Sequence, residues 1–147
     1  MNQFLTKKVV KATFDATSGK AIAAHNLGVY IPTGAIITNA FFDVRTTFTS
    51  AGDTATIALS VEGADDLVAA IAINDVSNLW DAGVQGTLAG SAALSVFHAS
   101  NNPTAIQMAD SISDSYIKTT ADRALTATVA TQALTAGVLD LYVEYVS

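Results

Sequence analysis

Apolar and polar residues alternate along much of this chain, and a period of two is typical of β-strands that bury one face. The alternation predicts strands over residues 10–14, 27–31, 54–61, 125–129 and 139–145. A Pro-Thr-Gly turn at residues 32–34 ends the second strand, because proline fixes φ and glycine permits a positive φ. In the last strand, Asp140, Tyr142 and Glu144 share the face opposite the apolar residues.

A longer apolar segment, residues 35–48, departs from simple alternation at its start. Ile37 and Phe41 lie among the polar residues of the strand, on the side opposite most of its apolar positions. We therefore expect the beginning of this strand to be covered on both faces. With residues 54–61 it predicts a β-hairpin across the turn at 50–53, and residues 125–129 and 139–145 predict a second hairpin.

The middle of the chain is less regular. Residues 65–73 fit either a strand or a single helical turn, because leucine and valine recur among alanines that favour helix. Residues 74–120 combine glycines, asparagines and a proline with short apolar pieces at 93–97 and 104–108. We expect short strands joined by longer loops there.

The whole pattern predicts one all-β domain over residues 9–147, preceded by an N-terminal arm at residues 1–8. About eight short strands, without heptads, linkers or repeats, are typical of a sandwich or closed barrel. A jelly-roll sandwich is our first choice, and an immunoglobulin-like sandwich is the alternative. We expect the polar arm to become ordered on binding to a partner.

Composition narrows the classes of partner. Seven Lys and Arg against 13 Asp and Glu give a net charge of −6, which provides no basic patch for nucleic acid or for an anionic membrane. Apolar runs do not approach the roughly 18 residues of a membrane span, and we expect no secretory signal. Only 14% of residues are charged. The surface is therefore either rich in Thr, Ser, Ala and Asn or partly covered by a partner.

Candidate catalytic and metal-binding residues are few. The chain has no cysteine, and neither His25 nor His98 has a second ligand at metal-binding spacing. Asp65 and Asp66, near Asp53 and Glu62, could supply oxygen ligands to calcium, but an acidic pair after Gly-Ala is more typical of a turn or a helix N-cap.

The remaining residues give no sign of catalysis. Asp110, Asp114 and Asp122 are spaced through a polar region where solvated side chains are expected. No nucleophile or phosphate-binding motif is present. We expect no catalytic residue, no cofactor, no bound metal and no enzymatic activity.

Trp80 is the one tryptophan in the sequence. It could anchor a protein interface or stack on a sugar, with Tyr30 and Tyr142 as further stacking candidates. The alternative is a core tryptophan, which we favour.

Four segments resemble proteins of known type. These are NLGVYIPTGAIITNAFFDV at residues 26–44, TTFTSAGDTATIALSVEG at 46–63, RALTATVA at 123–130 and LTAGVLDLYVEYV at 134–146. This arrangement of strands and turns resembles small virion proteins of tailed phages, including cyanobacterial and marine phages, that decorate or cement the capsid.

The resemblance implies a protein made in the host cytoplasm and located on the capsid surface, where it binds the major capsid protein across capsomers. It also implies a homotrimer, with Ile37 and Phe41 as candidate subunit contacts. Two alternatives stay open at this point. One is another virion component, such as a head fibre, a tail or neck part or a host-recognition module. The other is a carbohydrate-binding module.

Overall fold

In the computed structural model, the regular structure of the described residues is all β. The structure describes residues 6–83, 85–86, 105–107 and 115–147. Side chains are described at residues 6–83 and 116–147. The described residues contain no helix that could cross a membrane. The strands are β1 (Lys7–Asp15), β2 (Ala23–Ile31), β3 (Ile36–Ser50), β4 (Thr56–Ser60), β5 (Val68–Ala72), β6 (Gln85–Gly86), β7 (Ala105–Gln107), β8 (Ser115–Lys118), β9 (Arg123–Ala130) and β10 (Leu134–Val146).

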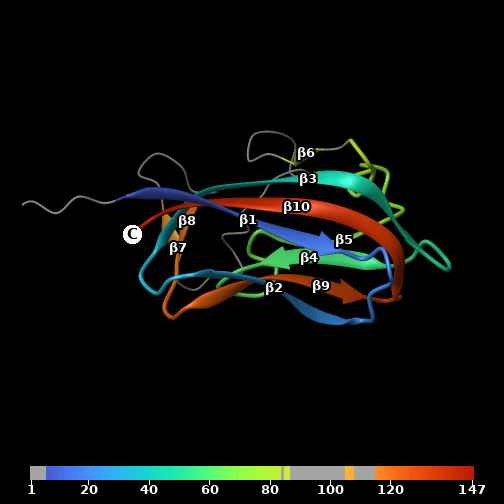
Figure 1. Cartoon of the computed structure of the whole chain (residues 1–147), viewed down its shortest axis with the longest axis horizontal. Helices are drawn as coiled ribbons and strands as arrows, with labels where there is room; N and C mark the ends of the chain where they lie inside the picture. The colour runs from blue at the N-terminus through green and yellow to red at the C-terminus, as the bar shows by residue number, and fades with distance from the viewer. Residues whose placement is uncertain (1–5, 84, 87–104, 108–114) are drawn as a thin grey trace, which may run out of the picture.

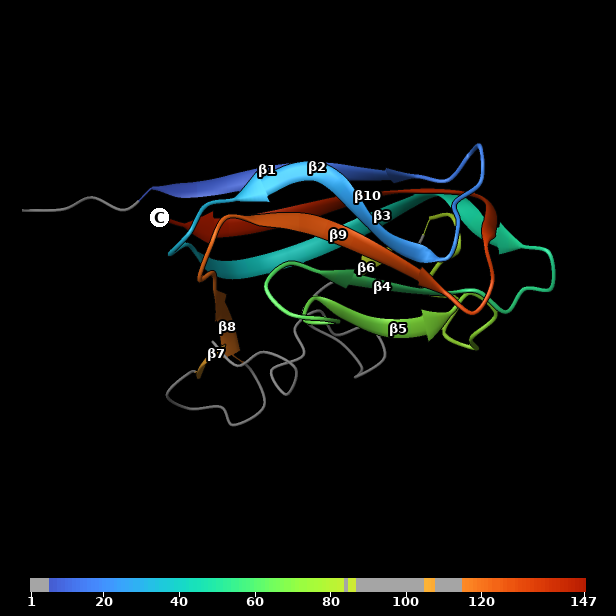
Figure 2. The same ribbon diagram turned by 90° about the horizontal axis from the view of Figure 1, so that it is seen from below.

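The strands form two antiparallel sheets. Sheet A has the order β1-β10-β3-β8-β7, with β6 also paired to β3, and sheet B has the order β2-β9-β4-β5. Figure 1 shows the sheets as two layers, with β3 and β10 on one side and β4 and β9 on the other. Figure 2 views the same sandwich from the side of sheet B. The predicted all-β sandwich is confirmed.

The strand pairing follows jelly-roll order. β1 pairs with β10, β2 with β9, β3 with β8 and β4 with β5, so the chain forms a ribbon of nested antiparallel pairs. Successive pairs belong alternately to sheet A and sheet B. A ribbon folded over in this way gives the two four-stranded layers of a jelly roll, which here carries the short extra strands β6 and β7.

Both predicted hairpins are wrong. β3 lies in sheet A and β4 in sheet B, so the turn at residues 51–55 crosses from one sheet to the other. β9 and β10 are likewise in different sheets. The physical reason is that the same alternation of apolar and polar residues suits two arrangements of consecutive strands. The strands can pair edge to edge within one sheet, or they can lie in two sheets that face one another across a core.

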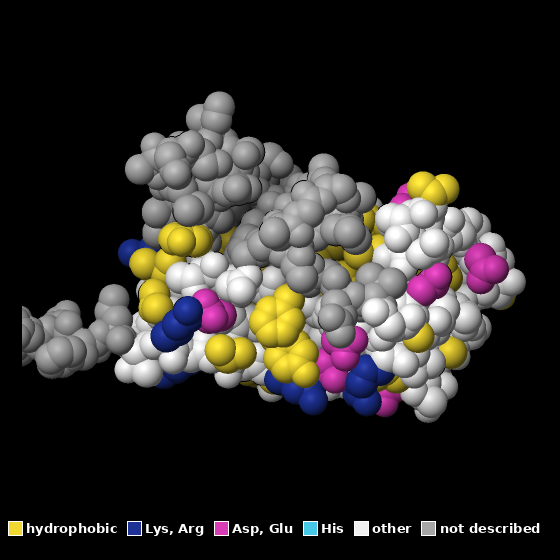
Figure 3. Space-filling view, turned by 90° about the horizontal axis from the view of Figure 1, so that it is seen from above, with side chains coloured by type: hydrophobic (Ala, Val, Ile, Leu, Met, Phe, Trp, Pro, Cys, Tyr) yellow, Lys and Arg dark blue, Asp and Glu magenta, His cyan; other side chains and the backbone are white. Residues whose placement is uncertain are grey.

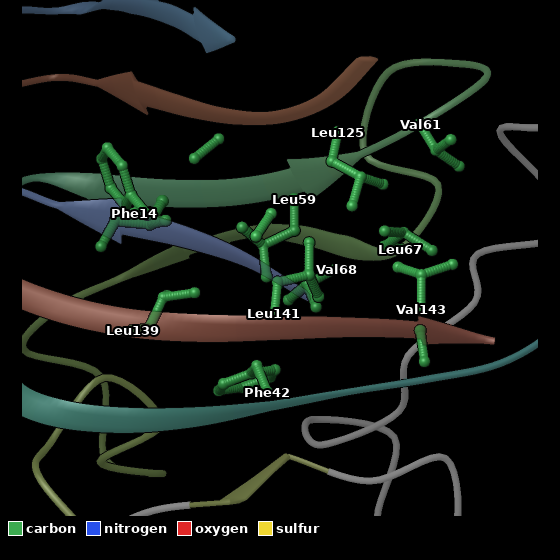
Figure 4. Packing of buried hydrophobic residues seen from close by; sticks show 14 of the residues in the cluster. Phe14, Phe42, Leu59, Val61, Leu67, Val68, Leu125, Leu139, Leu141 and Val143 are labelled. Carbon is green, nitrogen blue, oxygen red and sulfur yellow. The ribbon is translucent and has the colours of Figure 1, made fainter. Parts of the chain in front are cut away.

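The core lies between the two sheets. Figure 4 shows Leu139, Leu141 and Val143 of β10 on the side that faces Leu59 and Val68 of sheet B. All five side chains are buried. The inward and outward faces predicted for β4 and β10 are therefore correct. Within residues 65–73, strand β5 covers Val68–Ala72, so this segment contains a strand rather than a helical turn.

An aromatic cluster closes one part of the core. Phe48 stacks on Phe14 with ring centroids 5.7 Å apart, and Trp80 stacks on Phe42 at 5.3 Å. Gly137 in β10 faces this cluster, since a Cβ placed there would lie only 2.1 Å from Phe48 Cδ1. Its φ of +131° also belongs to the region that favours glycine.

Candidate partner-binding surface

Two aromatic rings lie together on the outer face of sheet A. Phe41 of β3 is directly opposite Tyr142 of β10, and their rings stack with centroids 4.8 Å apart. Phe41 remains 37% exposed, and Val9 on the neighbouring strand β1 is 58% exposed. We call Val9, Phe41 and Tyr142 the aromatic patch. Figure 3 shows hydrophobic side chains grouped on this face, between Lys or Arg and Asp or Glu side chains.

Asp140 organises one side of the aromatic patch. Its buried carboxylate accepts a hydrogen bond from Thr13 Oγ1 at 2.7 Å, and it pairs with Arg45 Nε at 2.8 Å and Lys11 Nζ at 3.7 Å. Burial alone would raise the pKa of this carboxyl, but the Thr13 hydrogen bond and the charges of Arg45 and Lys11 hold it below its usual value. The network thus joins β1, β10 and β3 through one ionised group.

Glu144 forms the other side of the patch. Its carboxylate lies 3.0 Å from Lys7 Nζ and accepts a hydrogen bond from Thr38 Oγ1 at 3.0 Å. The bond from Lys7 lowers the pKa of Glu144. An apolar centre with a charged rim is the general anatomy of a protein–protein interface.

The structure separates Ile37 from Phe41. β10 pairs Glu144 with Asn39 but Tyr145 with Ile37, so Thr38 is an extra residue in β3. This bulge reverses the inward and outward sides of the strand. Ile37 is fully buried in the core of its own chain, which accounts for its apolar character without a second subunit. Phe41, by contrast, remains available to a neighbouring molecule.

Trp80 belongs to the core and not to the surface. Its side chain is fully buried, and its Nε1 donates a hydrogen bond to the Ile71 carbonyl oxygen at 3.0 Å. The other sugar-stacking candidates lie on different faces, Tyr30 on β2 of sheet B and Tyr142 on β10 of sheet A. The structure therefore does not bring the three aromatic residues together.

Two of the acidic residues considered as calcium ligands, Asp66 and Glu62, have structural partners. The buried Asp66 carboxylate accepts backbone N–H bonds from Val61, Glu62 and Gly63 at 2.8–2.9 Å, and burial raises the pKa of this carboxyl. Glu62 in turn pairs with Arg123 Nε at 2.8 Å. Within the described residues, no group of three or more acidic or histidine side chains could hold a metal.

Of the two histidines, only His25 is among the described residues. His25 Nε2 lies 2.8 Å from the Ala21 carbonyl oxygen, and the imidazole ring stacks on Phe14. His98, Asp110, Asp114 and the apolar piece at residues 93–97 are outside the described residues.

The fold and this surface define an antiparallel β-sandwich with jelly-roll pairing and an exposed aromatic patch, and three solved structures share the fold. A chain in the acidic stable capsid structure of Helicobacter pylori bacteriophage KHP30 matches with a TM-score of 0.57 and 15% identity, over 98% of this chain and 94% of that chain. A chain in the cyanophage Pam1 capsid asymmetric unit matches at 0.53 and 21%, over 97% and 85%. A chain in the capsid of Ralstonia phage GP4 matches at 0.53 and 19%, over 95% and 84%.

Sequence comparisons add no family. No protein-family model matches the chain, and no curated protein matches it. The similarity to the three capsid chains is a similarity of fold.

Sequence reasoning did not find the network around Asp140. The alternation of β10 correctly placed Asp140, Tyr142 and Glu144 on the outward face. Their partners Thr13 and Arg45 lie 127 and 95 residues away in the sequence. Only the strand pairing brings these residues together, and no local pattern encodes that pairing.

Proposed function

We propose that this protein is a structural component of a phage virion, specifically a decoration or cement protein that binds the capsid surface. The observation that carries the proposal is the match of nearly the whole chain to chains of three phage capsids. The matches also cover 84–94% of those chains, so the neighbours are only slightly longer than this one. They are therefore small capsid chains of the same build.

The proposed partner is the major capsid protein, and the proposed contact is the aromatic patch of sheet A. An exposed Phe–Tyr stack can bury apolar area against the shell, while Lys11 and Arg45 at its rim can meet acidic groups. Aromatic residues and arginine are the side chains that most often dominate binding energy at interfaces.

No chemical step is needed for such a role. A protein that binds the assembled shell, but not its dissociated subunits, stabilises the shell by about 2.7 kcal/mol per site at a free concentration 100 times its Kd. Many equivalent sites make the sum large. Binding across a junction between capsomers would couple this energy to the integrity of the shell.

We also propose that the protein acts as a homotrimer on the virion surface. Three linked copies bind a three-fold site with an effective concentration that separate copies lack. From the sequence alone, Phe41 is a candidate contact between the copies. Its position in the aromatic patch, between the two charged networks, favours contact with the shell instead.

The test is binding of purified protein to shells that lack it, measured by co-sedimentation. The double variant Phe41→Ser/Tyr142→Ser should bind at least about tenfold more weakly, while its native mass stays that of the wild type. Val76→Ser is the matched control, because Val76 is 95% exposed on a loop outside the sandwich strands.

Three outcomes oppose the proposal. Equal binding by the double variant would remove the patch from the shell contact. A fall in the native mass of the double variant would indicate that Phe41 is a contact between copies. No binding of the wild type, or only a handful of copies per particle, would favour a tail or fibre component.

A further inference from the structure

The outward positions of the four strands of sheet B, all of which the structure describes, carry no charged side chain. Arg123, the first residue of β9, is opposite the buried Ile31 and pairs with Glu62. On the central strands β9 and β4, the outward residues that alternate with the buried ones include Thr126, Thr128, Thr56 and Ser60. The outward positions on the flanking strands β2 and β5 are alanine, asparagine, glycine or tyrosine. The result is a surface of small, uncharged side chains.

This surface is unusual for a chain with a net charge of −6. The outer face of sheet A, by comparison, carries two ion-pair networks centred on Asp140 and Glu144. Two copies with the same net charge repel one another, and the repulsion is weakest where the approaching surfaces carry no charge. Covering hydroxyl-bearing and apolar side chains also costs less desolvation than covering charged ones.

One aromatic side chain on this face is held in place before any contact forms. Tyr30 lies on β2, is 58% exposed, and pairs with Ala124 of β9. Its hydroxyl accepts a hydrogen bond from Asn26 Nδ2 at 3.0 Å, and Asn26 Oδ1 in turn accepts the Gly28 N–H at 2.7 Å. A fixed, exposed tyrosine loses little side-chain entropy on binding and is a typical interface anchor.

We infer that the outer face of sheet B is the contact between copies of this chain. The two halves of the face differ, since the β2–β9 half carries Tyr30 and the β4–β5 half carries only small residues such as Ser60 and Ala70. The protruding tyrosine on one half and the flat surface on the other suit a head-to-tail contact, which forms a closed assembly such as a trimer when the rotation between copies closes. This inference rests on the proposed function, because it assigns the surface that joins the proposed trimer.

The test places one lysine on each face. Thr128→Lys puts a charge at the centre of the sheet B face, and Thr46→Lys, on an exposed position of β3, is the matched control. Each variant changes the net charge by the same amount, toward zero, so general repulsion between copies would decrease in both. Native mass is measured by light scattering after size exclusion, over a range of protein concentrations.

The wild type and Thr46→Lys should have the native mass of an assembly of two or more 15.1 kDa chains. Thr128→Lys should dissociate at a concentration at least about tenfold higher than the wild type. Tyr30→Ser, at an exposed position, should weaken the assembly in the same direction. Folding of each variant is checked by the fluorescence of the buried Trp80. If Thr128→Lys does not fold, Tyr30→Ser tests the contact instead.

A monomeric wild type, or variants that assemble as tightly as the wild type, would overturn the inference. Shell binding measured in parallel separates this result from the proposed function. Wild-type protein that binds shells as a monomer keeps the decoration role and removes the contact between copies. Protein that assembles through Tyr30 and Thr128 but does not bind shells would keep the contact between copies and remove the decoration role. Loss of shell binding by Thr128→Lys with unchanged native mass would assign the sheet B face to the shell.

Discussion

Adding a single methyl group at Gly137 should destabilise the sandwich strongly. In Gly137→Ala the new Cβ would lie 2.1 Å, 2.4 Å and 2.6 Å from three ring atoms of Phe48. Phe48 has little room to withdraw, because its ring packs against Phe14 and Trp80. Forcing extra atoms into a packed core costs about 1–3 kcal/mol.

The backbone adds a second cost at the same position. Gly137 has a φ of +131°, and holding a residue with a side chain in such a sparsely populated region costs about 1–3 kcal/mol. Together, the two effects should lower the free energy of unfolding by about 2–6 kcal/mol. That is a large share of the roughly 5–15 kcal/mol that stabilises an ordinary domain.

The assay is equilibrium unfolding in urea, followed by the fluorescence of Trp80. This is the sole tryptophan in the chain and is fully buried, so its emission reports on the core beside Phe48. Protein concentration must be the same for every variant, because assembly would add to the apparent stability. The expected change is a lower urea midpoint with an unchanged slope.

Two further variants isolate the contact with Phe48. Gly34→Ala is the control, because Gly34 has a φ of +76° but no neighbouring atom within 4 Å of the position that a Cβ would take, so only the backbone cost of about 1–2 kcal/mol applies. Removing the ring with Phe48→Leu should make the cost of Gly137→Ala smaller by about 1–3 kcal/mol, as a double-mutant cycle measures. If Gly137→Ala costs no more than Gly34→Ala, or if the cycle gives no coupling, the packing argument is refuted.

Two other substitutions test Asp140, beside the aromatic patch, and Trp80, in the core. The pKa of Asp140 is below its ordinary value in the folded protein, so the stability that its charge contributes is present above the ordinary pKa of about 4 and is lost as the pH falls through its folded pKa. Asp140→Asn should therefore flatten the acid side of the stability profile, measured as urea midpoints between about pH 2 and 7. An unchanged profile would contradict this role. Trp80→Phe removes the hydrogen bond to the Ile71 carbonyl and part of a core side chain, so it should lower the free energy of unfolding by about 1–3 kcal/mol. This variant has no tryptophan, so its urea unfolding is followed by circular dichroism, beside the wild type. Its folded fraction should bind shells as well as the wild type, and weaker binding by fully folded protein would place Trp80 in a partner contact after all.

The sequence allowed the faces of strands to be predicted, but not their partners. Alternation correctly separated Leu139 and Leu141, which are buried, from Tyr142 on the outer face. The same alternation suggested hairpins at two places where the chain crosses between sheets. Burial of an apolar face fixes which side of a strand turns inward, whereas pairing depends on contacts with strands far away in the sequence.

The candidate surface was only partly predictable for the same reason. The sequence marked Phe41 as an apolar residue on a polar face, and the structure leaves it exposed there. Ile37 has the same parity, but the bulge at Thr38 turns it into the core, and this bulge exists only in the pairing with β10. The uncharged face of sheet B could not be predicted from the sequence, because it is formed by outward positions of four strands whose pairing only the structure gives.

The pairing of β1 with β10 has a consequence for how the protein folds. Lys7 is opposite Val146, so among the described strands the sheet A neighbour of β1 is β10, which ends the chain. Such nested long-range pairs raise the contact order, which favours slow folding, in roughly the millisecond-to-second range. During synthesis on a ribosome, β1 must wait for the rest of the chain with both of its edges free. The three lysines of β1 suit that interval, because charged side chains on an unpaired strand discourage association with other nascent chains.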